Sequence, residues 1–247
     1  MMSEWSLWAG LGGLSGLIVG SFLATLVLRW PEGRGLGGRS ACDGCGRLLR
    51  PVDLIPLLSF ALLRGRCRAC GGRIDWRHPA IELAAAGIGA LAMGVAPGIG
   101  GAAGALFGWM LLTLGALDAE HYWLPDALTW PLLGLGLLLG LGDWQDRALG
   151  AVLGGGSLWL VAFAWRRWRG VEGLGQGDVK LFAGLGAWLN AAALPPLMLS
   201  AALLGLLSVG FRLWRGRPVA RDMRLPLGAL LAAVAFPLWI AKVLVEG

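Results

Sequence analysis

Long apolar segments separated by short polar ones dominate the pattern of this chain. Their approximate bounds are residues 5–28, 79–96, 99–117, 127–142, 148–165, 178–190, 192–212 and 226–245. A helix of about 20 apolar residues crosses a bilayer. The fourth and sixth segments are shorter, so we interpret them as tilted or as partial spans beside a water-filled cavity. The pattern predicts an all-α, polytopic membrane helical bundle of about eight transmembrane helices.

Composition and the distribution of polar residues refine this picture. Hydrophobic residues make up 57% of the chain, and mean hydropathy is +0.69, which excludes a soluble domain with a polar surface. Polar residues gather mainly between the first two apolar segments. We therefore expect three parts: a first transmembrane helix at residues 1–28, a small loop domain at 29–78, and a membrane helical domain at 79–247.

The basic residues indicate how the helices are oriented. Ten arginines lie between Arg29 and Arg77, three between Arg166 and Arg169, and five between Arg212 and Arg224. These clusters fall on one side if eight helices alternate, and the positive-inside rule makes that side cytoplasmic. Membrane orientation and anionic lipid explain the net charge of +6 without nucleic acid. The first segment lacks a basic n-region, so we expect a retained helix rather than a cleaved signal.

Two aspartates lie at the ends of apolar segments, where a carboxylate is costly. Asp118 follows the apolar stretch from Ala102 to Leu117, and Asp178 opens the segment that ends at Leu189. The predicted topology brings both to the cytoplasmic face. Two carboxylates forced together share a proton, so one can act as a base on water while the other acts as an acid on a peptide carbonyl. Helix capping is the alternative for Asp178, but a helix C-terminus disfavours an anion such as Asp118.

The loop domain contains all four cysteines in two CxxC pairs. They are Cys42 and Cys45, then Cys67 and Cys70, with glycines beside each pair. Paired thiolates on two tight turns are typical of a zinc ribbon or knuckle. Disulfides or reduced thiols without a metal are the alternatives, but disulfides are rare on the cytoplasmic side, where the arginines place this loop. Four cysteines complete a tetrahedral shell, so the zinc would be structural.

The order of the motifs resembles one family. The motifs are Gly20-Ser21-Phe22-Leu23, the two CxxC pairs, Arg77-His78-Pro79 with Glu82-Leu83, the run from Asp118 to Asp126, and Gly175-Gln176-Gly177-Asp178-Val179-Lys180. Nearly the whole chain resembles the type IV prepilin peptidases, which are membrane aspartyl proteases of the GxGD class.

This resemblance implies a specific activity. Such enzymes remove the leader from prepilins, or from pseudopilins of type II secretion, on the cytoplasmic side of the bacterial inner membrane. They cut after a glycine, and many then methylate the new N-terminal amine with S-adenosylmethionine. The family's catalytic aspartates align with Asp118 and Asp178, and its metal-binding cysteines align with the four cysteines of this chain.

Three departures from the family pattern lie outside the aspartate pair. Asp43 stands where a proline usually follows the first cysteine, Leu54 replaces an asparagine before Ile-Pro, and Ala24 replaces another asparagine. All three fall in the region associated with methyl transfer. No glycine-rich loop after a strand is visible to hold a nucleoside, so methyl transfer depends on the resemblance alone.

Several neighbouring residues are candidates for supporting roles. Gly175 and Gly177 relax the backbone before Asp178, and Lys180 either stabilises that carboxylate or reaches lipid phosphates. Asp126 after Pro125 is interpreted as a helix cap more readily than as an acid. Glu82 is a membrane carboxylate whose partner the sequence does not identify.

The favoured function is therefore leader cleavage from prepilins by the aspartate pair. One alternative is a non-enzymatic membrane assembly factor whose zinc loop docks a partner. Another is a protease with the same aspartate pair that acts on other single-span substrates.

Overall fold

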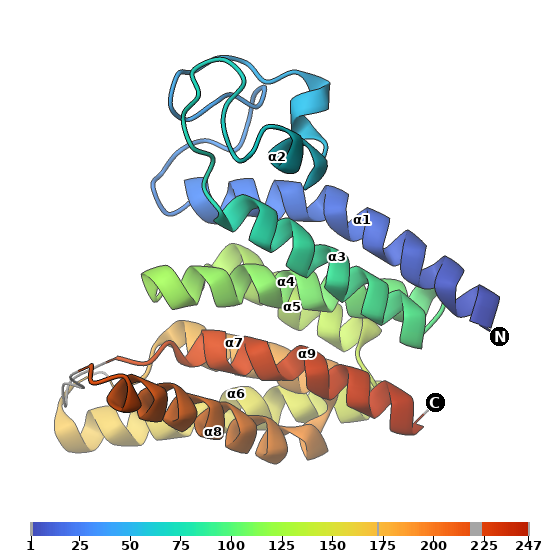
Figure 1. The fold of residues 1–247 in the computed structure, drawn as a ribbon. Coiled ribbons are helices and arrows are strands. Elements are labelled where there is room, and N and C mark those ends of the chain that lie inside the picture. The colour runs from blue at the N-terminus through green and yellow to red at the C-terminus, as the bar shows by residue number, and fades with distance from the viewer. Residues whose placement is uncertain (1, 172, 218–223, 247) are drawn as a thin grey trace. The chain divides into compact units, whose positions relative to one another are not determined.

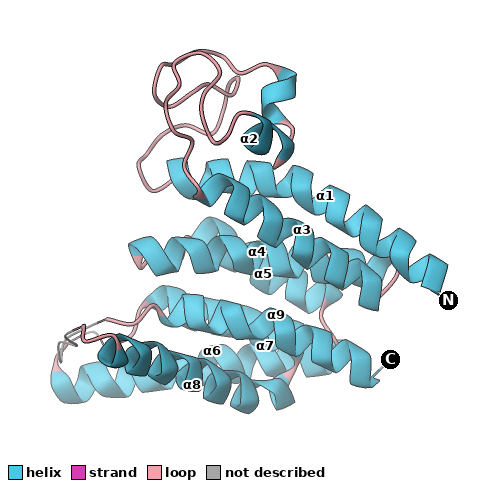
Figure 2. Ribbon diagram, viewed as in Figure 1, coloured by secondary structure: helices cyan, strands magenta, loops and turns pink. Residues whose placement is uncertain are grey.

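Each of the eight predicted apolar segments corresponds to one helix in a computed structural model that describes residues 2–171, 173–217 and 224–246 (Figure 1). The membrane-type helices are α1 Met2–Arg29, α3 Arg77–Val95, α4 Ile99–His121, α5 Asp126–Leu139, α6 Trp144–Arg169, α7 Gln176–Leu189, α8 Leu194–Trp214 and α9 Leu227–Glu246. Short elements complete the set: the 3₁₀ helices η1 Pro51–Leu54 and η2 Ala191–Ala193, and the α-helix α2 Leu58–Leu62. Over the described ranges the chain is helix and loop without a strand, which confirms the all-α prediction (Figure 2).

Helix length separates the eight helices into two groups. Six described helices are long and apolar enough to cross a membrane: α1, α3, α4, α6, α8 and α9. Helices α5 and α7 have 14 residues each, so each extends about 21 Å at 1.5 Å per residue. That is less than the hydrocarbon thickness of about 30 Å. These are the two segments that the sequence marked as short, so the expected eight spans become six full-length candidates.

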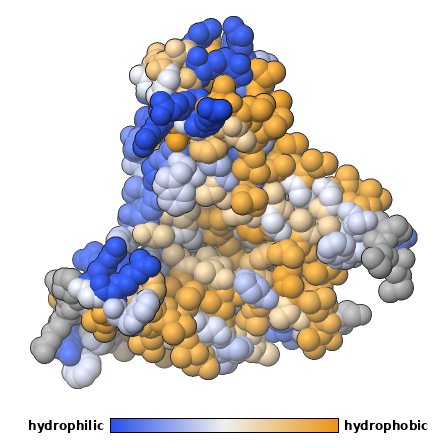
Figure 3. All heavy atoms as spheres, viewed as in Figure 1, coloured by the Kyte–Doolittle hydropathy of each residue, from blue (hydrophilic) through white to orange (hydrophobic). Residues whose placement is uncertain are grey.

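The outer surface of the helices is apolar, as expected for a chain in contact with lipid. Large hydrophobic side chains are exposed on several helices, for example Ile18 at 71%, Leu206 at 68% and Leu207 at 69%. On the face drawn in Figure 3, hydrophilic residues gather over the loop between α1 and α3. The loop therefore contrasts with the helices in the way that the sequence pattern predicted.

The chain forms two compact units, residues 1–112 and 113–247, with the boundary inside α4. In the first unit, α1 packs along α3 (Figure 1). Gly12, Gly16 and Gly20 recur every fourth residue on α1, and a Cβ at Gly12 would lie 2.1 Å from the Gly89 carbonyl oxygen. Small residues at this spacing let two helix backbones approach closely, as in membrane helix pairs.

In the second unit, α7 lies between other helices and packs against α5, α6 and α9. Its residues Leu181, Leu185 and Trp188 are fully buried. The Trp188 indole donates to the carbonyl of Leu132 in α5 at 2.9 Å. Gly150 of α6 and Gly186 of α7 are so close that a Cβ on either would meet the backbone of the other. Helix α7, which carries Asp178, is thus held on several sides.

Candidate active site and metal centre

Asp118 lies in the last turn of α4 and is only 5% exposed. Its Oδ2 accepts a hydrogen bond from the backbone N–H of Ala229 at 2.8 Å, and the backbone N–H of Gly228 also bonds to this carboxylate. Both amides belong to the first turn of α9. The C-terminal end of α4 disfavours an anion, but the N-terminus of α9 supplies donors and a positive dipole end. The N-terminus of α9 therefore offsets the energetic cost of placing the Asp118 carboxylate at the C-terminal end of α4.

Asp178 also lies at a helix N-terminus, in the first turn of α7. The N-cap of α7 is Gly175, so Asp178 is the third helical residue rather than the cap itself, although its carboxylate accepts a free amide at this helix start, as the capping alternative expected. The Gly175 amide hydrogen-bonds to the Asp178 carboxylate, and the negative charge of Asp118 acts on the same group. Both aspartates thus occupy positions at which a helix dipole favours a carboxylate, within electrostatic range of each other.

Leu124 lies against the starts of both α7, which carries Asp178, and α9, which binds the Asp118 carboxylate. A Cβ at Gly177, which precedes Asp178, would lie 2.7 Å from the Leu124 Cβ, and one at Gly228 would lie 2.9 Å from the Leu124 Cδ1. One leucine side chain therefore touches both α7 and α9 beside their N-termini. These residues all belong to the unit 113–247, so this unit assembles both carboxylates by itself.

Gly175 and Gly177 are important because they lack a side chain, and not because they adopt unusual backbone angles. Gly175 has φ −70° and ψ 144°, which any residue adopts, and Gly177 lies within the first turn of α7. A Cβ at Gly175 would lie 3.1 Å from Asp178 Oδ2. The absence of side chains therefore leaves room for the Asp178 carboxylate and for Leu124.

Lys180 pairs with Asp126 in α5. Its Nζ lies 2.6 Å from Asp126 Oδ1, with side-chain exposures of 25% and 62%, and 5.7 Å from the centre of the Trp130 ring. Asp126 is the first residue of α5, and Pro125 occupies the N-cap without a side-chain hydrogen bond. The expectation that Asp126 caps a helix is therefore wrong, and its carboxylate instead connects α5 to α7.

The four cysteines of the loop domain form one cluster. Their sulfur atoms all lie within 4.8 Å of one another, and the Sγ atoms of Cys42 and Cys70 are 3.9 Å apart. A tetrahedral zinc site with Zn–S bonds of about 2.3 Å has sulfur separations of about 3.8 Å. The donor set and its dimensions therefore fit a tetrahedral metal ion.

Two turns of the same design hold the four thiols. The Gly46 N–H donates to the Cys42 carbonyl at 2.8 Å, and the Gly71 N–H donates to the Cys67 carbonyl at 2.9 Å. Both glycines have φ 69°, a left-handed conformation that strains other residues. Backbone N–H groups of Cys70 and Ala69, together with the Cys42 thiol, lower the pKa of the Cys67 thiol to about 6. The neighbouring cysteines raise the pKa of the Cys70 thiol to about 11, so the cluster favours one thiolate, at Cys67, which is the metal-binding form.

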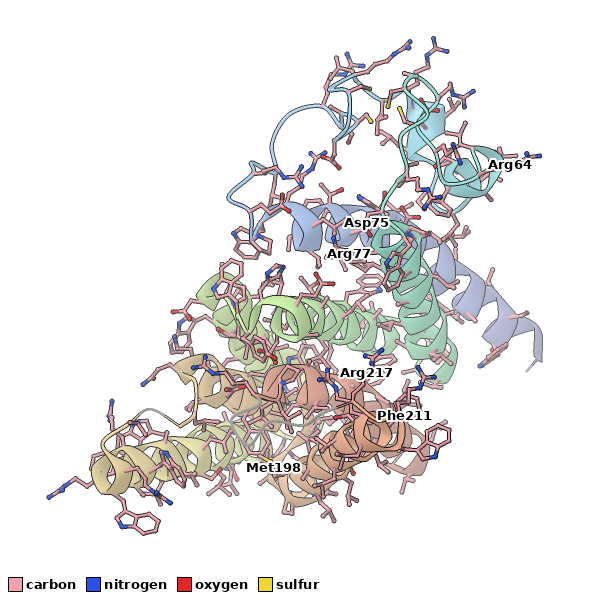
Figure 4. The ribbon with its side chains drawn as sticks, turned by 60° about the vertical axis from the view of Figure 1, so that its left-hand side comes forward. Arg64, Asp75, Arg77, Met198, Phe211 and Arg217 are labelled. Atoms are coloured by element: carbon pink, nitrogen blue, oxygen red, sulfur yellow. The ribbon has the colours of Figure 1, made fainter. Side chains whose placement is uncertain are left out.

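An ion pair attaches the first cysteine turn to the end of α1, and a second ion pair lies at the start of α3. Asp43 Oδ1 lies 3.1 Å from Arg29 at the end of α1 and 2.8 Å from Arg34. Asp43, which stands where the family usually has a proline, therefore adds ion pairs between the first cysteine turn and the residues at and after the end of α1. Asp75 and Arg77 lie together at the start of α3, with their charged groups 2.6 Å apart (Figure 4).

Glu82 of α3 has a partner in the backbone of the loop domain. Its Oε2 accepts the N–H of Leu57 at 2.8 Å, and the residue is 7% exposed. Leu57 has φ 58° and precedes α2, whose first amides have no helical acceptor. A buried carboxylate in α3 therefore holds the segment before α2 of the loop domain against α3.

Comparisons with known proteins match both parts of the chain. The Bacterial Peptidase A24 N-terminal domain model matches residues 14–95, which include the cysteines. The Type IV leader peptidase family model matches residues 105–210, which include both aspartates. Helix α9 lies beyond both matched ranges. No solved structure matches the chain.

Curated relatives match over most of their length. A prepilin leader peptidase/N-methyltransferase of Burkholderia pseudomallei is 40% identical, over 88% of this chain and 80% of the relative. Proteins of the same name from Dickeya chrysanthemi and Pseudomonas putida are 40% and 37% identical, each over 92% of this chain and 87% of the relative.

Proposed function

Because this chain belongs to the type IV leader peptidase family, we propose that it removes the leader peptide from prepilins and N-methylates the amine that the cut exposes. It is a multi-pass bacterial membrane protein. The observation that carries the peptidase part is the placement of Asp118 and Asp178, whose carboxylates interact at the N-termini of α9 and α7. The comparisons do not favour a non-enzymatic assembly factor.

The aspartate pair supplies general acid–base catalysis in this proposal. Two coupled carboxylates share one proton between them. One aspartate takes a proton from water as the water oxygen attacks the scissile carbonyl, and the other gives a proton to the carbonyl oxygen. Collapse of the tetrahedral intermediate breaks the C–N bond, and a proton passes to the leaving amine. The substrate is extended at the cut, because a helical peptide hides its scissile carbonyl.

The loop domain holds a structural zinc ion in this proposal. Cys42, Cys45, Cys67 and Cys70 would bind it as thiolates and leave no open position for water. The ion would cross-link the two cysteine turns, and the ion pair between Asp43 and Arg29 attaches the first of these turns to α1. S-adenosylmethionine would be consumed as the methyl donor. This second activity depends on family membership, since no residue here is assigned to bind the donor.

The charge pattern supports a cytoplasmic active site in the inner membrane. The arginine clusters follow the positive-inside rule, and the ten arginines between Arg29 and Arg77 suit a substrate with an acidic residue early in its apolar helix. Prepilins, or pseudopilins of type II secretion, are the proposed substrates. A glycine before the cut would fit a narrow site that has no room for a side chain.

A cleavage assay with the purified full chain tests the function. In lipid vesicles, a prepilin peptide with its leader and apolar helix should lose the leader, and S-adenosylmethionine should add one methyl group to the new N-terminus, both read by mass spectrometry. A peptide with a bulky residue in place of the glycine should remain intact. Cleavage of an unrelated soluble peptide at the same rate would contradict prepilin specificity, and absence of leader release would contradict the function.

A further inference from the structure

The first turn of α9 makes the direct contacts to Asp118. The first backbone hydrogen bond within α9 runs from Leu230 N–H to the Pro226 carbonyl at 3.1 Å. The N–H groups of Gly228 and Ala229 precede this bond, so they have no acceptor within the helix. They donate to the Asp118 carboxylate, which lies 111 residues earlier than Ala229. The carboxylate and the helix end therefore satisfy each other.

These hydrogen bonds restrict how the carboxyl group is oriented. A charge-assisted bond of 2.8 Å from Ala229 holds Oδ2, and such bonds are short and directional. With Oδ2 held against α9, the carboxyl group cannot rotate freely. Catalytic groups lose rate steeply when they move, and a displacement of about 1 Å can cost about 100-fold. A fixed carboxyl orientation is thus a catalytic requirement.

The packing at Gly228 leaves no room for a side chain. A Cβ there would lie 2.9 Å from Leu124 Cδ1 and 3.0 Å from Asp118 Oδ2. Leu124 also touches Gly177, just before Asp178. A continuous line of contacts therefore runs from Asp118 through the start of α9 and Leu124 to the start of α7. A shift of α9 would change the separation of the two aspartates.

A further contact attaches the segment before α9 to the segment after α4. The Tyr122 hydroxyl donates to the carbonyl of Arg224 at 3.2 Å. Tyr122 has φ 51°, a conformation that is strained for a residue with a side chain and that persists where surrounding contacts impose it. Two contacts therefore connect the end of α4 to the beginning of α9: the Tyr122 hydrogen bond to Arg224 and the Asp118 hydrogen bond to Ala229.

We propose that the N-terminal turn of α9 is a third part of the peptidase site, in which Gly228 and Ala229 are positioning residues for Asp118. This proposal rests on the proposed function. Neither residue lies within the range matched by the family model, which ends at residue 210. Their role acts through the orientation of a carboxylate, so it should affect the chemical step more than substrate binding.

Two pairs of matched variants test the proposal with the full chain in vesicles. Gly228→Ala adds a methyl group against Asp118 and Leu124, whereas Gly134→Ala adds the same group where nothing lies within 4 Å. Ala229→Pro removes the N–H that bonds to Asp118, whereas Gln145→Pro places a proline in the first turn of α6, away from the aspartates. Proline is tolerated in the first turn of a helix. For Gly228→Ala and Ala229→Pro we expect kcat for prepilin cleavage to fall about 10- to 100-fold, with KM within about twofold of the unmodified chain.

The controls separate positioning from a loss of folding. Gly134→Ala and Gln145→Pro should keep kcat near that of the unmodified chain, and all four variants should unfold at similar temperatures. Unchanged kcat in folded Gly228→Ala and Ala229→Pro would overturn the proposal. A matching loss in Gln145→Pro, or a rise in KM that accounts for the whole effect, would also overturn it. Failure of the unmodified chain to cleave prepilin would instead refute the proposed function.

Discussion

The cysteine cluster and the aspartate pair are two sites built in opposite ways. The cysteines come from two short turns, and each turn is closed by hydrogen bonds between residues four or five apart, such as Gly46 to Cys42 at 2.8 Å. The aspartates come from α4 and α7, and Asp118 is held by α9, which is 111 residues away at Ala229. One site depends on local turns and the other on the packing of three helices.

This difference determines how each site responds to change. Two of the cysteines, Cys45 and Cys70, are exposed, so their cluster loses geometry when its ion or its turns are lost, with little effect on helix packing. Asp118 is 5% exposed, and its partners are backbone amides of a buried helix end. The aspartate site therefore tolerates damage to the loop, but it does not tolerate a displaced helix.

The largest effect is expected at the aspartates themselves. Asp118→Asn and Asp178→Asn should each reduce prepilin cleavage by at least about 10³-fold, because an amide cannot carry the shared proton. Metal content and the unfolding temperature should stay near those of the unmodified chain. Asp143→Asn is the matched control, since Asp143 caps α6 by accepting the Asp146 N–H at 2.9 Å and asparagine caps a helix equally well. Full activity in either aspartate variant would refute the aspartyl mechanism.

A smaller effect on cleavage is expected when the metal is lost. The full chain purified without chelator should contain about one zinc ion, with Zn–S distances near 2.3 Å, and Cys45→Ser should lower that content. Limited proteolysis should then cut the region 30–76 faster, because the ion no longer joins the two turns. Cleavage of prepilin should fall less than methyl transfer does.

Metal analysis and paired activity assays provide the measurements. Less than about half an equivalent of zinc in the unmodified chain, with four free thiols, would remove the zinc proposal. If Cys45→Ser reduced cleavage as strongly as Asp118→Asn does, the two sites would not be independent, and the contrast between them would be wrong.

The same contrast explains what the sequence predicted and what it missed. The eight helices followed from apolar length, and the cysteine cluster followed from CxxC spacing, because both signals are local. The contact between Asp118 and α9 has no local signal: Pro226 before an apolar run predicts that a helix starts there, but not which carboxylate meets its amides. The partner of Glu82 was missed for the same reason, since it is the backbone of Leu57, which leaves no side-chain signal in the sequence.

The smallest effect is expected at Lys180, where helix geometry already argues against contact with Asp178. Residues two apart lie on different faces of a helix, and Lys180 instead meets Asp126 of α5 at 2.6 Å. Because the Asp126 side chain is 62% exposed, the pair should contribute no more than about 1 kcal/mol to stability. Lys180→Met and Asp126→Asn should therefore reduce cleavage only about two- to fivefold, through a slight movement of α7.

Exchange of the two charges separates this positioning role from chemistry. The double variant Asp126→Lys with Lys180→Asp restores opposite charges between α5 and α7, so it should recover part of the activity that either single variant loses. Kinetics of the two single variants and the double variant give the coupling energy between the residues. If Lys180→Met abolished cleavage as completely as Asp178→Asn and the exchange recovered nothing, Lys180 would belong to the catalytic group. The aspartate site would then depend on Lys180 of α7 as well as on α9.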